Sequence, residues 1–218
     1  MTKLHAFNVP RQVILLSLLT LWPALAYTAA PTAAQIQNAY DAGQKLAQNT
    51  DSGYPGGEYL VYAVPDALKL EAQNGSVDAV LAGTPLERTR YESFLSALGE
   101  DPITPQQARE RTQVPDHTIE FLVYAHGSTP EDQSFQAKFS AARLTLGGQT
   151  FNSTSTDKSD TSSSLYPRTA GEIGVRYTGI VMYHFKVPVR LDGASGTLRF
   201  TDATGKTFRL AVNLSRYR

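Results

Sequence analysis

Alternation of apolar and polar side chains through residues 179–214 constrains the fold of this chain more than any other feature. A period of two places every second side chain on the same face of a strand. The last apolar set is Phe208, Leu210, Val212 and Leu214. An earlier set, at positions 181, 183, 185 and 187, ends at Pro188, which cannot donate a ladder hydrogen bond. The segment therefore predicts three half-buried strands joined by tight turns, packed against a second sheet.

Further strands are expected upstream, at residues 58–64, 68–70, 76–81, 118–126 and 135–146, the last with a bulge near Ser140. The Asn74-Gly75 pair predicts a hairpin between the second and third of these. Residues 118–126 carry apolar side chains on both faces, which indicates a central strand covered on both sides. About seven to nine short strands favour a mainly β chain with an immunoglobulin-like antiparallel β-sandwich.

A helical insert is expected at about residues 84–113. Thr84, Pro85 and Glu87 have the spacing of a capping box with proline in the first turn. The apolar row that follows, expected to cover the sheet, is Tyr91, Phe94, Leu95 and Leu98. Thr104, Pro105 and Gln107 repeat the cap for a shorter helix.

The N-terminus has the pattern of a secretory signal peptide. Lys3 and Arg11 precede an apolar run at residues 13–22, and Ala24-Leu-Ala26 supplies the small residues of a cleavage site. The run is about ten residues long where a membrane span needs about 20. We expect residues 1–26 to be removed, with Ala30 as the alternative site, and the protein to be secreted or periplasmic. Residues 27–53 are then a helical leader and linker, and residues 54–218 the β-sandwich domain.

The chain has no cysteine, so neither a lipid anchor on cysteine nor a disulfide is available to the exported protein. Loss of Lys3 and Arg11 with the signal leaves 18 basic and 20 acidic residues. This near-neutral balance provides no general field for nucleic acid or an anionic membrane. We therefore expect neither a nucleic-acid partner nor, after processing, an integral membrane protein.

Histidines and carboxylates offer two candidate metal sites. His126 and His184 could meet across a sheet and bind zinc with Glu120. Asp157 and Asp160 lie in residues 149–164, a Ser- and Thr-rich segment expected to be a long exposed loop, where oxygen ligands could hold calcium. Ordinary surface histidines and a solvated loop explain both patterns more simply, so no metal site is assigned.

Other polar signals are also explained without chemistry. Asn152 begins a glycosylation sequon, which matters only in a glycosylating host. Asp192 and Asp202 open expected turns, where a short carboxylate bonds its own backbone. The chain contains no HExxH, GxSxG, P-loop or GxGxxG motif. No catalytic or cofactor-binding residue is therefore assigned, and no cofactor is expected.

Residues 179–188, 196–200 and 205–210 resemble the end of immunoglobulin-like domains of unknown function in secreted bacterial proteins. In those domains, a strand closing in Phe-x-Val-Pro is followed by two alternating strands. The resemblance implies an extracellular binding or structural module, and it supplies no functional residues.

Three function hypotheses follow. The first is an exported, non-enzymatic β-sandwich that binds a protein or a cell-envelope component. The second is a secreted hydrolase or carbohydrate-active protein that uses carboxylates from separate strands, which need only meet in space. The third is a carrier of a small ligand or a metal. A groove holding two acids with raised pKa values would favour the second, and clustering of His126, His184 and Glu120 the third.

Overall fold

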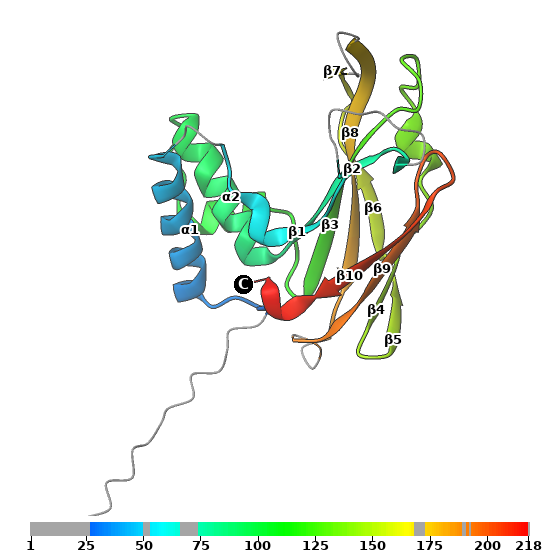
Figure 1. The fold of residues 1–218 in the computed structure, drawn as a ribbon. Coiled ribbons are helices and arrows are strands. Elements are labelled where there is room, and N and C mark those ends of the chain that lie inside the picture. The colour runs from blue at the N-terminus through cyan, green and yellow to red at the C-terminus, as the bar shows by residue number, and fades with distance from the viewer. Residues whose placement is uncertain are drawn as a thin grey trace, which may run out of the picture.

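The computed structural model describes residues 27–49, 53–65, 74–167, 173–188, 191 and 193–217. This part of the chain is mainly β, with two antiparallel sheets and three α-helices gathered on one side of the sheets (Figure 1). The expected signal peptide, the strand expected at residues 68–70, and Asp192 lie outside the described residues. None of the helices in the described ranges has the length and apolar character needed to span a membrane.

The first sheet, sheet A, contains β1 (Leu60–Ala63), β2 (Val77–Gly83), β3 (Thr118–His126), β6 (Ser155–Lys158), β7 (Ser162–Pro167) and β8 (Ile173–Lys186). Its order is β1-β2-β3-β8-β6, and β7 also pairs with β8. The strand expected to be central is central, since β3 pairs with β2 and β8. All of its residues except Tyr124 are buried, as its two apolar faces require.

Sheet B contains β4 (Arg143–Leu146), β5 (Gln149–Asn152), β9 (Ser195–Thr201) and β10 (Thr207–Asn213), in the order β10-β9-β4-β5. Phe208, Leu210 and Val212 are buried while Thr207, Arg209 and Ala211 are exposed, so the alternation predicted for this strand is confirmed. These side chains share one core with the inner face of sheet A. Aromatic rings join the sheets, with the Tyr183 and Phe200 centroids 5.6 Å apart.

The helices are α1 (Ala33–Ala47), α2 (Pro85–Leu98) and α3 (Pro105–Arg111). Capping threonines start all three, and α2 and α3 occupy the segment where a helical insert is expected. The expected leader helix, α1, packs on α2 through Gly43, its only buried residue. A β-carbon at Gly43 would overlap the carbonyl oxygen of Arg90, so glycine permits this close approach. We refer to α1, α2 and α3 together as the helical layer.

Two local predictions are wrong. The strand expected at residues 135–146 begins only at β4, because residues 135–138 form a 3₁₀ turn (Phe135–Lys138). This turn, and not a bulge near Ser140, accounts for the change in which side chains face the core. Residues 149–164 are not a loop but form β5, β6 and the start of β7. These strands are largely exposed, and they form because backbone pairing to β4 and β8 requires no apolar side chain.

Candidate functional site

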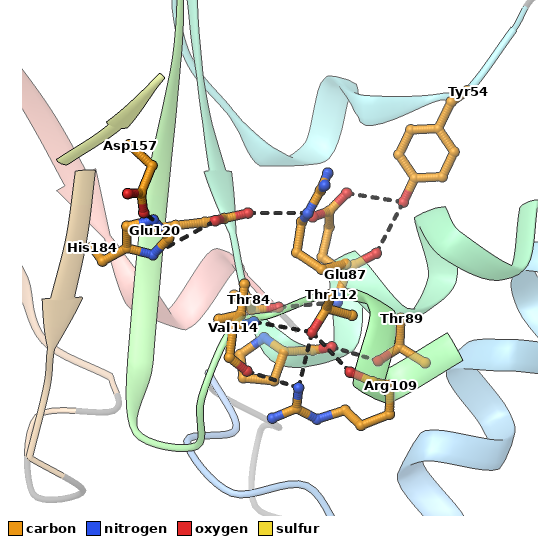
Figure 2. Close-up of polar contacts among 12 residues, drawn as sticks. Tyr54, Thr84, Glu87, Thr89, Arg109, Thr112, Val114, Glu120, Asp157 and His184 are labelled. Atoms are coloured by element: carbon orange, nitrogen blue, oxygen red, sulfur yellow. Dashed lines mark hydrogen bonds and ion pairs between the residues drawn. The ribbon is translucent and has the colours of Figure 1, made fainter. Parts of the chain in front are cut away.

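A cluster of buried charges lies where the helical layer meets the outer face of sheet A, the face that carries Glu120 and His184 (Figure 2). β2 ends at Gly83 and α2 begins at Pro85, so the first turn of α2 is held beside β3. The side chain of Thr84 accepts a hydrogen bond from the backbone nitrogen of Glu87. The reciprocal half of the expected capping box does not form, because the Glu87 carboxylate is turned toward Tyr54.

Four residues, which we call the Glu120 network, connect α2 with three strands. Arg88 Nε lies 3.0 Å from Glu120 Oε1, and Glu120 Oε2 lies 3.8 Å from His184 Nδ1. His184 Nε2 lies 2.9 Å from Asp157 Oδ2. Glu120 and His184 are direct register partners on β3 and β8, and Asp157 comes from the neighbouring β6. The network therefore runs across sheet A from the helical layer to an edge strand.

Burial controls the electrostatics of this network. Glu120 is 3% exposed, and desolvation raises its pKa to about 7. The Arg88 guanidinium acts in the opposite direction, whereas the charges of Glu87 and Asp157 raise the pKa further. Burial likewise raises the pKa of Glu87, which is 5% exposed. Glu87 and Glu120, which both interact with Arg88, therefore hold their protons to higher pH than an exposed glutamate does.

Gly83 makes room for the buried carboxylate. It is the register partner of Glu120 on β2. A β-carbon at Gly83 would lie 2.6 Å from both Cγ and Oε1 of Glu120. The strand beside Glu120 therefore offers a space that any larger residue would fill.

A second set of polar contacts extends from Glu87 to the surface. The hydroxyl of Tyr54 donates to Glu87 Oε1 at 3.0 Å and accepts from Arg90 Nε at 2.9 Å. Arg90 Nη1 donates to Glu58 Oε1 at 2.6 Å. The Arg90 guanidinium also lies over two aromatic rings, 5.3 Å from the centroid of Tyr54 and 5.1 Å from that of Tyr59. Arg90 is therefore held in place by a carboxylate, a phenol and two ring faces.

Arg90 forms part of the wall of a cleft of about 320 Å³ between α1 and the 3₁₀ turn Gly56–Tyr59. We call it the α1 cleft. Its walls include Asn38, Ala39 and Ala42 on one side and Glu58, Tyr59 and Arg90 on the other. Small apolar side chains with a few convergent polar groups are typical of a ligand site. Sites of this volume hold small organic molecules.

The structure separates the residues that were considered as zinc ligands. His184 lies beside Glu120, but His126 is six residues farther along β3, about 20 Å away at the rise of a strand. His126 Nδ1 instead lies 2.9 Å from Asp78 Oδ1. Among the described residues there is no group of three or more His, Cys, Asp or Glu side chains that could hold a metal ion.

The other sequence candidates are also dispersed. Asp157 belongs to the Glu120 network, whereas Asp160 lines a separate cleft beside Tyr124. Asp202 has the turn role expected for it, accepting from the backbone nitrogens of Thr204 and Lys206. It also accepts from the backbone nitrogen of Ser76 and so joins two distant turns. Asn152 ends β5 and is exposed.

The apolar row of α2 is only partly buried. Phe94 is buried against Tyr54, with ring centroids 5.3 Å apart. Leu95 and Leu98 remain 42% and 45% exposed. The expectation that the whole row covers the sheet is therefore wrong for its C-terminal half.

Sequence reasoning did not identify Tyr54, Glu87, Arg88 or Arg90 as site residues. Tyr54 lies in a Gly- and Pro-rich linker, and Glu87 was interpreted only as a cap. One feature of the sequence pointed to a buried polar site: Glu120 interrupts an apolar strand that was expected to be covered on both faces. A buried carboxylate requires a cation nearby, and two arginines occur in the helix that follows β2.

Comparisons with protein-family models, with curated proteins and with solved structures found no match for this chain.

Proposed function

We propose that this protein is an exported, non-enzymatic binding protein with an immunoglobulin-like sandwich, and that the α1 cleft binds a small organic carboxylate from the cell envelope or its surroundings. The observation that carries the proposal is Arg90, fixed in the cleft wall over Tyr54 and Tyr59 and paired with Glu58. A guanidinium held in one orientation can donate a charge-assisted hydrogen bond from Nη1 to a carboxylate.

Displacement of Glu58 would open the site to a ligand. The Glu58 side chain is 55% exposed, so its pairing with Arg90 is screened by solvent. Arg90 Nη2 is buried and Nε donates to Tyr54, so Nη1, which now donates to Glu58, is the nitrogen offered to a ligand. A ligand carboxylate can therefore replace Glu58 at Arg90 while Ala39 and Ala42 contact its carbon skeleton.

If the signal peptide is removed, the position of Tyr27 favours cleavage after Ala26 over cleavage after Ala30. The Tyr27 ring is 1% exposed, and its hydroxyl donates to the carbonyl oxygen of Thr118 at 2.9 Å. Cleavage after Ala30 would remove this side chain from the core. N-terminal sequencing of the exported protein should therefore begin at Tyr27.

The positions of the two buried acids, Glu87 and Glu120, favour binding over hydrolysis. Glu87 and Glu120 have raised pKa values, as an acid catalyst requires. Neither acid lines the α1 cleft, and a general acid must reach its substrate within hydrogen-bond distance.

The test uses the mature chain, which has no tryptophan because Trp22 lies in the expected signal peptide. Protein purified from its own host is denatured, and the small molecules it releases are identified by mass spectrometry. Ala42→Trp fills the α1 cleft, and Ala34→Trp places the same side chain at an exposed position on the same helix, outside the cleft. We expect a carboxylic acid to be released by the wild type and by Ala34→Trp but not by Ala42→Trp.

A panel of simple carboxylates (acetate, succinate, glutamate and glucuronate) gives the direct measurement. Far-ultraviolet circular dichroism and thermal unfolding confirm that each variant is folded. Amide chemical-shift changes should cluster at Arg90 and Tyr59 in the wild type. Absence of any acid from the released material, together with no shift for any panel member, would reject the proposed function.

A further inference from the structure

The Glu120 network contains a buried carboxylate whose charge is only partly compensated. Arg88 Nε and Glu120 Oε1 are 3.0 Å apart, but neither atom has an aligned hydrogen bond among the described residues. The other oxygen, Oε2, is 3.8 Å from His184, beyond hydrogen-bond distance. Ionisation of this carboxylate in the closed structure is therefore costly.

The groups that face Glu120 come from four elements. α2 contributes one cation, Arg88, and one carboxylate, Glu87, while β8 contributes His184. β6 contributes Asp157, and β2 contributes only Gly83, which has no side chain. One permanent cation thus faces three carboxyl groups when Glu120 is included.

His184 and Asp157 lie between this buried group and the exposed edge of sheet A. The Asp157 side chain is 62% exposed on edge strand β6, and it contacts His184 Nε2. His184 Nδ1, on the other side of the same ring, faces Glu120. The His184 ring thus lies between an exposed and a buried carboxyl group, although Nε2 has no aligned hydrogen bond among the described residues.

We propose that the Glu120 network is a proton-sensitive latch between α2 and sheet A, closed when Glu120 is protonated and loosened when Glu120 is ionised. This function goes beyond ligand binding in the α1 cleft and does not depend on it. The direction follows from linkage, because separation of α2 from β3 would hydrate Glu120, and water favours the ionised carboxylate more than the closed junction does. The raised pKa of Glu120, about 7, supports a transition near neutral pH.

The absence of cysteine allows a direct test of this latch. Single cysteines replace Leu98, exposed at the far end of α2, and Arg209, exposed on β10, and both carry spin labels. The distance distribution between the labels is measured by pulsed electron paramagnetic resonance from about pH 5.5 to about pH 8.5. We expect one narrow distance at the acid end and a broader or second population at the alkaline end.

Two variants and one control determine the outcome. Glu120→Gln, which cannot ionise, should keep the narrow distance at every pH. Arg88→Gln removes the cation that stabilises ionised Glu120 in the closed junction, so the open population at alkaline pH should be larger than in the wild type. Asp132→Asn removes a carboxylate that pairs with Lys138, outside the network, and should respond like the wild type.

The result for Arg88→Gln keeps the test independent of how well Glu120→Gln folds. A wild-type distance that does not change with pH would overturn the proposal. So would a pH response that persists in Glu120→Gln, or an open population at alkaline pH in Arg88→Gln that is no larger than that of the wild type.

Discussion

The two faces of strand β3 are built from neighbouring residues, yet they stabilise the protein in different ways. Ile119, Phe121 and Val123 point into the core shared by the two sheets, and all three are fully buried. Glu120, on the other face, is almost as deeply buried but lies beside Arg88 of α2 and the His184 ring of β8. The inner face holds the fold under all conditions, whereas the outer face holds the helical layer in a way that depends on protonation.

The largest expected effect is on the inner face. Phe121 is fully buried, and its ring meets that of Phe185 edge-on at 5.8 Å. Phe121→Ala should lower the free energy of unfolding by about 3–5 kcal/mol, because it leaves a cavity that the core cannot fill. Denaturant unfolding should show the same loss at acid and alkaline pH. A loss that changed strongly with pH would mean that the two faces are not independent.

On the outer face, stability itself should depend on pH. The folded protein keeps the proton on Glu120 up to a pKa of about 7, whereas the unfolded chain releases it near 4.5. The free energy of unfolding should therefore fall by about 3 kcal/mol as pH rises through this window. Glu87, whose pKa is also raised, contributes in the same direction.

Glu120→Gln should remove the Glu120 part of this pH dependence, since an amide does not titrate. Glu131→Gln changes an exposed glutamate and serves as the control. Denaturant unfolding at a series of pH values gives the comparison. If the free energy of unfolding changed with pH in the same way for the wild type and Glu120→Gln, Glu120 would have the same pKa in the folded and unfolded chains.

A smaller effect is expected from the space beside Glu120. Gly83→Ala should cost about 1–3 kcal/mol, because the added methyl group overlaps the Glu120 side chain. In a Glu120→Ala background the same substitution should cost much less. A double-mutant cycle measures this coupling, and additive costs would show that Gly83 does not serve the carboxylate.

The smallest effect is expected at the exposed end of the Glu120 network. Asp157→Asn should change the free energy of unfolding by less than about 1 kcal/mol, because solvent screens the pair with His184. The pH dependence of the free energy of unfolding should nevertheless shift slightly to lower pH in this variant, since Asp157 raises the pKa of Glu120. A loss as large as that of Phe121→Ala would place Asp157 among the residues that hold the fold.

Local patterns in the sequence were sufficient for the features that arise locally. Strand β10 buries every second residue, and a period of two is visible in seven consecutive letters. The caps of α2 and α3 depend on residues three positions apart. Strands β5 and β6 were missed because their polar side chains carry no burial pattern, and backbone pairing with distant strands defines them.

The candidate site depended on contacts that sequence spacing does not record. Tyr54, Glu87 and Glu120 are far apart in the chain and meet only because α2 starts where β2 ends. The zinc hypothesis placed His126 with His184 because both were expected at strand ends or on strand faces. Antiparallel register puts Glu120, not His126, opposite His184.

The pKa of Glu120 tests the central claim most directly. A carbon-13 NMR titration of the glutamate side-chain carboxyl groups, assigned with Glu120→Gln, measures it in the folded protein. A midpoint at about 7 is expected if the outer face of sheet A buries this carboxyl group against α2. A midpoint near the ordinary value of 4.5 would mean that water reaches Glu120 and that the outer face holds the helical layer without a proton.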